Sequence, residues 1–245
     1  MKVRSRTFLA KIFSRILLIF IVLSTSAGFL VSAFANSGEP YQTELPDALN
    51  NAGWDLMLNH DGVEVYTRDW PGSDFVAVKG VQTINSSLSN ILANYADVAS
   101  FPEWVKDMVE ARLVEPLDQF RSRKVYMRMG LPWPLRDRDM IIGQTFSQNI
   151  QSKVVHVKEW YEGETFPPVE GVIRMPRLNS ELLLIPVGKN RTKLIYQGHN
   201  DPGGFIPSFL VNWMIEDVFF DSMLNMRVRF ESIEYQKNLD WVSDF

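Results

Sequence analysis

The sequence of 245 residues contains no cysteine, and that absence excludes several kinds of chemistry. Without a thiol the chain can form no disulfide bond, no thiolate metal site and no cysteine nucleophile. The histidines, His60, His156 and His199, stand far apart in the sequence and show no metal-ligand spacing. We therefore expect neither a metal ion nor another cofactor.

Motifs for phosphate binding or for a hydrolytic serine are also missing. Gly203 and Gly204 form a pair before a predicted helix, but no lysine follows them as it does in a phosphate-binding loop. No serine stands in a Gly-x-Ser-x-Gly elbow. Aspartate and glutamate are plentiful, yet no pair of carboxylates stands out, so we assign no catalytic residue and expect no enzymatic activity.

Positive charge is scarce outside the N-terminus. The first 35 residues hold five basic and no acidic side chains, and the remaining 210 residues hold 20 basic against 29 acidic ones, a net charge of −9. An acidic surface repels phosphate backbones, so we expect no nucleic acid as a partner. With 46% hydrophobic and 22% charged residues, the composition is that of a globular protein.

The first 35 residues have the order of an export signal. Met1–Arg15 is basic, Ile16–Leu23 is wholly apolar, and Ser32–Ala35 ends in an Ala-x-Ala cleavage pattern. This order predicts a signal peptide over residues 1–35, cleaved after Ala35, so that the mature chain is secreted across the inner membrane. A secreted chain without cysteine favours a bacterial periplasm over a eukaryotic secretory pathway.

The alternative is an uncleaved N-terminal helix that anchors the protein in the membrane. Apolar character continues from Ile16 to Phe34, which supports an anchor. Small polar residues interrupt that stretch, however, and a spanning helix needs about 20 predominantly apolar residues. Attachment through a lipidated cysteine is excluded, because no cysteine follows the apolar stretch.

After the export signal the sequence predicts a short linker and then one domain. Residues 36–46 are polar and contain glycine and proline, as is typical of a linker. The domain extends over residues 47–245, in which no further interdomain linker stands out. Asp47 can cap a helix that runs to about Leu58.

The rest of the domain is predicted to form two strands, a helix, seven further strands and a terminal helix. Val63–Arg68 and Phe75–Ile84 predict two strands of a hairpin, and Ser86 or Ser87 caps the helix that follows. Seven further strand-like runs are Ala111–Pro116, Lys124–Met129, Asp139–Phe146, Val154–Tyr161, Val172–Met175, Glu181–Pro186 and Thr192–His199. A long helix without proline or glycine spans about Ser208 to Asn238. The pattern predicts an α+β fold with an antiparallel sheet, because strands without crossover helices do not build a parallel one.

A cluster of charges stands before one of these strands. Trp133 lies between two prolines, four alternating charges follow, and an apolar strand then begins. Within that strand Arg138, Met140 and Ile142 share one face. The charges either mark a solvated strand end, or they place Arg138 in a cavity, where its guanidinium needs a carboxylate or a polar ligand head group.

The terminal helix is apolar nearly all round. Gly203–Ile215 contains no charged residue, whereas a surface helix should show a polar side. The helix is therefore either buried in the core or a lid over an apolar pocket, with its outer side able to touch a membrane.

Four bulky residues of this helix share a face. Phe209, Trp213, Phe220 and Leu224 lie within about 60° of one another at helical spacing. We expect this face to close a ligand tunnel, although two charged residues, Glu216 and Arg227, fall near the same angles.

Methionine is frequent, with ten residues, and its flexible side chain suits a pliable apolar interior or simple core filling. The candidate ligand-binding residues are Met127, Met129, Trp133, Arg138, Met140, Ile142, Tyr196, Phe209, Trp213, Phe220, Met223 and Leu224.

Several short motifs occur in an order that resembles the START (steroidogenic acute regulatory protein-related lipid transfer) domain family. They are Trp54; Asp61-Gly62-Val63 with Val65, Tyr66 and Arg68; Val78-Lys79-Gly80; Pro132-Trp133-Pro134 with Arg138-Asp139-Met140-Ile141; Glu170-Gly171-Val172-Ile173-Arg174; Thr192-Lys193-Leu194; and Gly203-Gly204 with Ile206 and Pro207. Met140 replaces the aromatic residue of the family's central Arg-Asp-Phe motif. The resemblance extends from Trp54 to Glu231.

The resemblance implies a helix-grip fold, in which a curved antiparallel sheet wraps around a long C-terminal helix and encloses an internal apolar cavity for one lipid. It implies no shared catalytic constellation. It also marks Arg138 as the motif arginine that faces the cavity. The resemblance identifies no carboxylate partner for Arg138, and we take Asp118 and Glu110 as candidates.

We therefore expect an exported, periplasmic protein that binds or transfers a lipid or sterol-like small molecule. It is expected to be a monomer and to touch a membrane transiently through its C-terminal helix region. Two alternatives stay open: a cyclase/aromatase-type enzyme that uses the same cavity, and an envelope interaction protein whose core is filled.

Overall fold

A computed structural model describes residues 44–118, 121–163, 166–235, 239 and 241–244. The predicted signal peptide over residues 1–35 and most of the predicted linker over residues 36–46 lie outside the described residues. All described residues belong to one compact unit, Gly38–Phe245.

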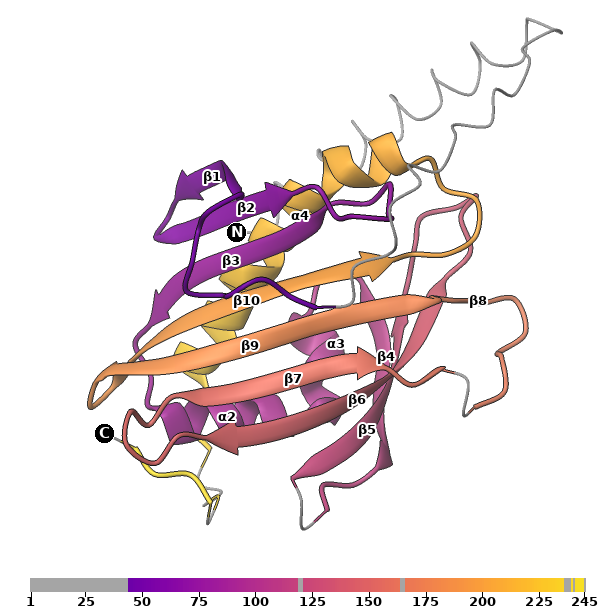
Figure 1. Cartoon of the computed structure of the whole chain (residues 1–245). Coiled ribbons are helices and arrows are strands. Elements are labelled where there is room, and N and C mark those ends of the chain that lie inside the picture. Colours follow the sequence, from indigo (N-terminus) through magenta and orange to yellow (C-terminus); the bar gives the residue numbers. More distant parts are fainter. Residues whose placement is uncertain (1–43, 119–120, 164–165, 236–238, 240, 245) are drawn as a thin grey trace, which may run out of the picture. The chain divides into compact units, whose positions relative to one another are not determined.

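Ten strands form one curved sheet (Figure 1). They are β1 (Asp55–His60), β2 (Val63–Arg68), β3 (Ala77–Ile84), β4 (Met108–Glu115), β5 (Ser122–Met129), β6 (Arg138–Gln148), β7 (Val155–Tyr161), β8 (Ile173–Arg174), β9 (Arg177–Gly188) and β10 (Arg191–Asp201). Their order in the sheet is β1-β2-β3-β10-β9-β7-β6-β5-β4, and every neighbouring pair in this path is antiparallel. The short β8 pairs in parallel with the start of β6.

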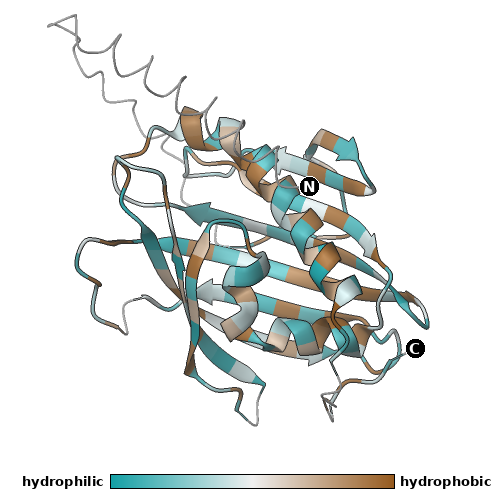
Figure 2. Cartoon of the chain, turned by 180° about the vertical axis from the view of Figure 1, so that it is seen from behind, coloured by the Kyte–Doolittle hydropathy of each residue, from teal (hydrophilic) through white to brown (hydrophobic). Residues whose placement is uncertain are grey.

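The helices lie on one face of this sheet, which we call the inner face (Figure 2). They are α2 (Leu88–Ala96), the 3₁₀ turn η1 (Val98–Ser100), α3 (Phe101–Trp104) and α4 (Ser208–Ser232). Ser87 caps α2 as predicted, since its Oγ accepts a hydrogen bond from the Asn90 amide at 3.2 Å. Within the described residues no helix combines the length and the apolar character needed to cross a bilayer.

Helix α4 approaches the sheet closely at Gly80 on β3. A Cβ atom at Gly80 would lie 2.7 Å from the Phe219 ring and 2.9 Å from the Met223 sulfur, so this position has no room for a side chain. Beside it, the Gln82 side-chain amide donates to the Met223 carbonyl at 3.0 Å. The missing side chain therefore lets α4 pack directly on β3.

A second apolar cluster lies on the outer face of the sheet, on which the described residues place no helix. Its buried members are Trp54, Tyr66, Trp70 and Ala77. Lys79 is fully buried beside it, and its Nζ donates to the Asn50 carbonyl at 2.9 Å and to Asn51 Oδ1 at 2.6 Å. Gln197 donates to the Pro46 carbonyl. Burial lowers the pKa of Lys79 to about 8. The segment before β1 is thus bonded across the outer face.

The helix predicted from Asp47 to Leu58 is wrong. Asp47 and Asn50 use their side-chain oxygens to close turns, accepting from the amides two residues later at 2.9 Å in both cases. Gly53 then adopts a positive φ of 75°, which ends any helical path, and β1 pairs with β2. The turn-forming residues prevail over the helical spacing of the apolar ones. The predicted strands after it are present, with ends shifted by a few residues.

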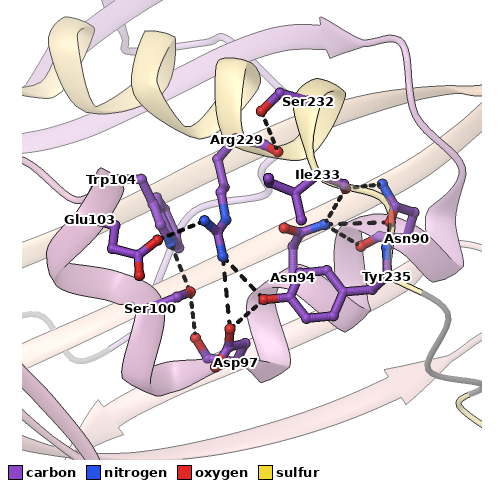
Figure 3. A network of polar contacts seen from close by, with 10 residues as sticks. All are labelled: Asn90, Asn94, Asp97, Ser100, Glu103, Trp104, Arg229, Ser232, Ile233 and Tyr235. Atoms are coloured by element: carbon purple, nitrogen blue, oxygen red, sulfur yellow. Dashed lines mark hydrogen bonds and ion pairs between the residues drawn. The ribbon is translucent and has the colours of Figure 1, made fainter.

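The terminal helix is shorter than the predicted range of Ser208 to Asn238, because α4 ends at Ser232 (Figure 3). Asn90 and Asn94 of α2 both donate to the Ile233 carbonyl at 3.1 Å. The Tyr235 amide donates in turn to Asn90 Oδ1 at 2.9 Å. Side chains of α2 therefore form hydrogen bonds with the backbone groups that another helical turn would have paired.

The short helices η1 and α3 were not predicted, and they help to fix the end of α4. Arg229 lies 2.9 Å from Glu103 of α3 and 3.8 Å from Asp97, and it donates to the Tyr235 hydroxyl at 3.1 Å (Figure 3). Tyr235 donates to Asp97 as well. The C-terminal end of α4 is thereby held by a network of polar contacts.

Candidate functional site

The inner face of β5, β6, β7, β9 and β10 forms an apolar interior together with α4. Eight of the predicted ligand-binding residues lie in this core or pack against it: Met127, Met129, Met140, Ile142, Tyr196, Phe220, Met223 and Leu224. On β6 the alternation places Met140 and Ile142 on this face, as predicted. The structure therefore brings these eight side chains into one region.

Tyr196 has an unusual environment in this interior. It lies on β10, between β3 and β9 in the middle of the sheet, and its ring centroid is 5.7 Å from that of Phe219 on α4. Despite this covered position the side chain is only partly buried.

Three predicted residues do not join this interior. Trp133 is 81% exposed, Phe209 is 64% exposed and Trp213 is 55% exposed. The face that we expected to close a tunnel is therefore not uniformly turned inward: α4 meets the sheet through Phe219 and Met223. A role of the three exposed residues in ligand binding stays a prediction.

A buried polar network crosses this apolar interior at Glu159 on β7. Glu159 Oε1 accepts from the Tyr95 hydroxyl of α2 and from the Gln144 amide of β6, the latter at 2.5 Å. Glu159 Oε2 accepts from the Ser180 hydroxyl of β9 at 2.6 Å. Three donors from three elements thus satisfy a carboxylate that is 5% exposed.

Arg123 on β5 supplies the positive end of the same network. Its Nε donates to Gln144 Oε1 at 2.6 Å, while its Nη atoms donate to the carbonyls of Tyr95 and Ala96 at 3.0 and 3.2 Å. These carbonyls end α2, where a cation is favourable to the helix dipole. Burial lowers the pKa of Arg123, an effect that the neighbouring Tyr95 and Glu159 oppose. Gln144 therefore connects cation and anion through the two ends of its amide.

Two tyrosines of the interior, Tyr95 and Tyr196, are held in their protonated form. Burial raises the pKa of Tyr95 well above its usual value, and the charge of Glu159 raises it further. Burial also raises the pKa of Tyr196, again with a contribution from Glu159. Both phenols therefore stay neutral and can donate hydrogen bonds throughout the physiological pH range.

The network was not predicted, although the sequence carries a signal for it. Gln144 has the same strand phase as Met140 and Ile142, and Arg123 has the same phase as Met127. A polar residue in phase with apolar neighbours indicates an inward polar group.

Arg138, the motif arginine, is buried at the start of β6, with 3% of its surface exposed. Its guanidinium donates to backbone carbonyls: to Arg136, and to Pro202 and Gly203 at 3.3 Å each. Burial lowers its pKa, and the nearby charge of Arg136 lowers it further. The arginine thereby connects the start of β6 to the loop before α4.

The expectation of Glu110 or Asp118 as the partner of Arg138 is wrong. Glu110 pairs with Arg112 at 3.2 Å, and Asp118 accepts from the Ser122 amide at 2.9 Å. Among the residues that the structure describes, no carboxylate forms an ion pair with Arg138. The carbonyl groups of the loop before α4 occupy that position instead.

The aspartate of the same motif has a separate role. Asp139 is 1% exposed and binds Arg174 with two bonds, Nε to Oδ1 at 2.7 Å and Nη2 to Oδ2 at 3.1 Å. Arg174 also donates to the Gly163 carbonyl at 2.7 Å. This bidentate pair joins β6 to β8 and the segment before it.

Exposed apolar side chains gather in the segments that Arg138 connects. Trp133 lies on the loop before β6, and Phe205, 94% exposed, follows the loop that accepts the bonds from Arg138. Phe209 and Trp213 continue this exposed series along the first turns of α4. We call these four residues the apolar tip.

The described residues contain no group of three or more side chains suited to hold a metal ion. Their arrangement combines an apolar interior, a satisfied polar network and a buried cation bonded to carbonyls. Such a set can hold an amphiphilic molecule by burial and hydrogen bonding.

Comparisons with known proteins agree with this arrangement. The profile of the START domain family matches residues 42–233. An uncharacterized protein of Pseudomonas aeruginosa is 31% identical over 175 residues, which cover 71% of this chain and 85% of that protein. Bovine phosphatidylcholine transfer protein is 28% identical over 173 residues, which cover 68% of this chain and 78% of that protein.

Solved structures share the fold. The STAR-related lipid transfer protein of Xanthomonas axonopodis superposes with a TM-score of 0.67 at 25% identity and covers 73% of this chain and 98% of its own. Human STARD10 superposes with a TM-score of 0.66 at 17% identity, over 76% of this chain and 80% of its own. The predicted curved antiparallel sheet with a long C-terminal helix, the helix-grip fold, is thus confirmed.

Proposed function

Since the chain belongs to the START domain family, we propose that it binds one lipid between the inner face of its sheet and α4. The protein carries this lipid without changing it chemically. Burial of the lipid drives binding, because each methylene group that leaves water contributes about 0.8 kcal/mol.

The observation that carries this proposal is the partial exposure of Tyr196. A side chain in the middle of a sheet, covered by a helix, keeps accessible surface when unfilled space borders it. Tyr196 fulfils that condition beside Phe219. A lipid chain in this space would contact the methionines of β5 and β6 and remain beside the polar network at Glu159.

The head group of the lipid is proposed to reach Arg138. Two of its hydrogen bonds, to the carbonyls of Pro202 and Gly203, are long at 3.3 Å each. A phosphate oxygen makes a stronger, charge-assisted bond to a guanidinium than a carbonyl does. A phosphate-bearing lipid can therefore exchange with these carbonyls and loosen the loop before α4.

The apolar tip is proposed as the part of the protein that contacts a membrane. Its four large side chains each expose more than half of their surface, which favours contact with an apolar partner. Since Arg138 connects the loops that carry them, contact with a bilayer and release of the loop before α4 would occur in the same place.

The export of the protein remains part of this proposal. The basic, apolar and small residues of positions 1–35 support secretion across the inner membrane, and the lack of cysteine supports the periplasm. We propose that the mature protein acts there as a monomer.

The test uses two fluorescent probes, a labelled phosphatidylcholine and a sterol analogue that lacks a phosphate. Arg138→Leu is expected to weaken phosphatidylcholine binding about ten- to a hundredfold, which is what loss of a charge-assisted hydrogen bond gives, and to leave sterol binding nearly unchanged. Arg136→Leu, which removes an exposed arginine two residues away, is the matched control and should bind both probes like the wild type.

Two results would contradict the proposal at different levels. Equal phosphatidylcholine affinity in Arg138→Leu and the wild type would remove the head-group role of Arg138. Failure of the wild type to bind either probe, together with no lipid in mass spectra of the protein as purified, would remove the lipid-binding function.

A further inference from the structure

The chain continues beyond the segment that matches the START profile, and its last described residues fold back onto the domain. The match ends at residue 233, whereas residues 239 and 241–244 contact the sheet and α2. We call residues 239 and 241–244 the C-terminal tail. Figure 1 shows this end of the chain beside α2 and the turn between β6 and β7.

Polar contacts fix the tail on two sides. Ser243 exchanges two backbone hydrogen bonds with the Gln148 side chain at the end of β6, at 2.8 and 3.0 Å. Its hydroxyl accepts from Lys153 at 2.9 Å. On the other side, Asp244 accepts from the amide and hydroxyl of Ser89, in the first turn of α2, at 2.8 and 2.5 Å. The tail therefore bridges the gap between α2 and the sheet.

Trp241 places a large ring inside this bridge. With Leu239 and Val242 it packs against the main core, and its ring centroid lies 6.1 Å from that of Phe146 on the inner face of β6. The Arg121 guanidinium lies over the Trp241 ring, 5.2 Å from its centroid. Within the described part of the chain, its buried Nε1 has no hydrogen-bond partner.

Phe146 connects Trp241 to the polar network of the interior. Its ring centroid lies 6.4 Å from that of Tyr95, and the Arg123 guanidinium lies 4.9 Å from it. Trp241 is thus separated from the network by one ring. A residue from outside the family profile therefore contributes to the interior in which the lipid is proposed to lie.

The tail lies at the opposite end of β6 from Arg138. The strand runs from Arg138 to Gln148, which is about 33 Å at 3.3 Å per residue. Arg138 and the apolar tip occupy the start of this path, and Trp241 and Ser243 occupy its end. A lipid that enters beside Arg138 with its chains along β6 would meet Phe146 and Trp241 last.

We propose that the C-terminal tail forms the closed end of the lipid site and that Trp241 sets the longest acyl chain the site accepts. This inference rests on the proposed lipid-binding function. It adds a specificity-determining residue from a part of the chain that the family profile does not cover.

The test measures which lipids the full-length protein extracts from vesicles that contain phosphatidylcholines of graded acyl length in equal amounts. Bound lipids are identified by mass spectrometry. Trp241→Ala is expected to raise the ratio of long to short acyl chains about tenfold, the factor expected from roughly two newly buried methylene groups. Trp241→Phe keeps a ring at this position and should retain the wild-type ratio.

Two further variants make the result independent of folding defects in Trp241→Ala. Gln148→Ala removes the side chain that holds Ser243 and should shift the ratio in the same direction. Ile150→Ala changes an 84% exposed residue in the nearby turn and should leave the ratio as in the wild type.

The outcomes separate the two proposals. An unchanged ratio in folded Trp241→Ala and Gln148→Ala, beside a wild type that extracts lipid, would overturn the role of the tail and leave the lipid-binding function intact. A wild type that extracts no phosphatidylcholine of any length would overturn both, because the tail would then close no lipid site.

Discussion

His199 lies fully buried on the outer face of β10. Its imidazole stacks on Trp70 with centroids 4.9 Å apart, and its Nε2 lies 3.0 Å from Ser73 Oγ and 3.1 Å from the Phe75 carbonyl. Burial lowers the pKa of His199 from 6.5 to about 4. The Phe75 carbonyl and Asp201 act in the opposite direction, and Arg177 adds to the lowering. The folded protein therefore holds this histidine neutral at pH 7.

Because the pKa of His199 is lowered on folding, we expect the protein to lose stability in acid. Below pH 6.5 the unfolded chain binds a proton at position 199 that the folded chain does not bind until about pH 4. The free energy of unfolding should therefore fall by about 2 to 3 kcal/mol as the pH falls through this window, and the contribution is fully present above pH 6.5. Urea unfolding at a series of pH values measures it.

His199→Gln should flatten this part of the pH profile, since an amide can donate to the same carbonyl without titrating. His60→Gln is the matched control, because His60 is exposed. A His199→Gln profile as steep as that of the wild type would assign the acid sensitivity to other groups.

At the scale of single residues, the alternation along a strand predicted which side chains share a face, but it did not predict their hydrogen-bond partners. The alternation along β6 was enough to predict that Arg138, Met140 and Ile142 share one face. Besides the nearby Arg136 carbonyl, the partners of Arg138 are the carbonyls of Pro202 and Gly203, more than 60 residues away, and these two depend on where a loop passes. No pattern within the strand contains that information.

At the scale of elements, the contact between α4 and β3 depends on the absence of a side chain at Gly80. Gly80→Val should force Phe219 and Met223 away from the sheet and lower the free energy of unfolding by about 1 to 3 kcal/mol. Urea or thermal unfolding measures this change.

Gly188→Ala is the matched control, because a Cβ atom there would lie 3.8 Å from its nearest neighbour, an ordinary contact. Equal stability of Gly80→Val and the wild type would mean that α4 adapts to the added side chain without loss of packing.

The elements themselves were predicted where one face of a strand is apolar and turns are marked by glycine, proline or asparagine. The helix expected over residues 47–58 failed because Trp54 belongs to the outer cluster and Gly53 turns the chain before it. The end of α4 was overestimated because its termination depends on Asn90 and Asn94, which belong to another helix. Local spacing does not record such long-range bonds.

At the scale of the whole molecule, the apolar tip predicts how the protein meets a membrane. Phe205→Ser combined with Phe209→Ser should weaken binding to phosphatidylcholine vesicles about a hundredfold or more, because each aromatic side chain contributes about 1.5 to 3 kcal/mol when it leaves water. Thermal stability should change little, since both side chains face solvent. Sedimentation with vesicles measures the binding.

Ile150→Ser provides the control for general loss of surface hydrophobicity, as Ile150 is 84% exposed at the other end of β6. Equal vesicle binding of the double variant and the wild type would place the membrane contact elsewhere on the protein.

The overall architecture could be predicted from the sequence because few arrangements bury so many strands with one long helix. The α+β class followed from the order of the elements, and the resemblance to START domains supplied the helix-grip arrangement that the structure confirms. The C-terminal tail was not predicted because its short sequence shows neither a helical nor a strand period, while it packs on the core through Leu239, Trp241 and Val242.

Helix α4 is held near both of its ends. Its 25 residues span about 37 Å, and its C-terminal end is held by Asn90, Asn94 and the contacts of Arg229. Near its start, the Asn212 side chain accepts from the Val76 amide at 3.1 Å and donates to the Asp74 carbonyl at 2.9 Å. A tilt of about 10° around the C-terminal end moves the first turns by about 6 Å, a little more than one helical pitch. Such a displacement would break both hydrogen bonds of Asn212, so opening of the Arg138 end requires their loss.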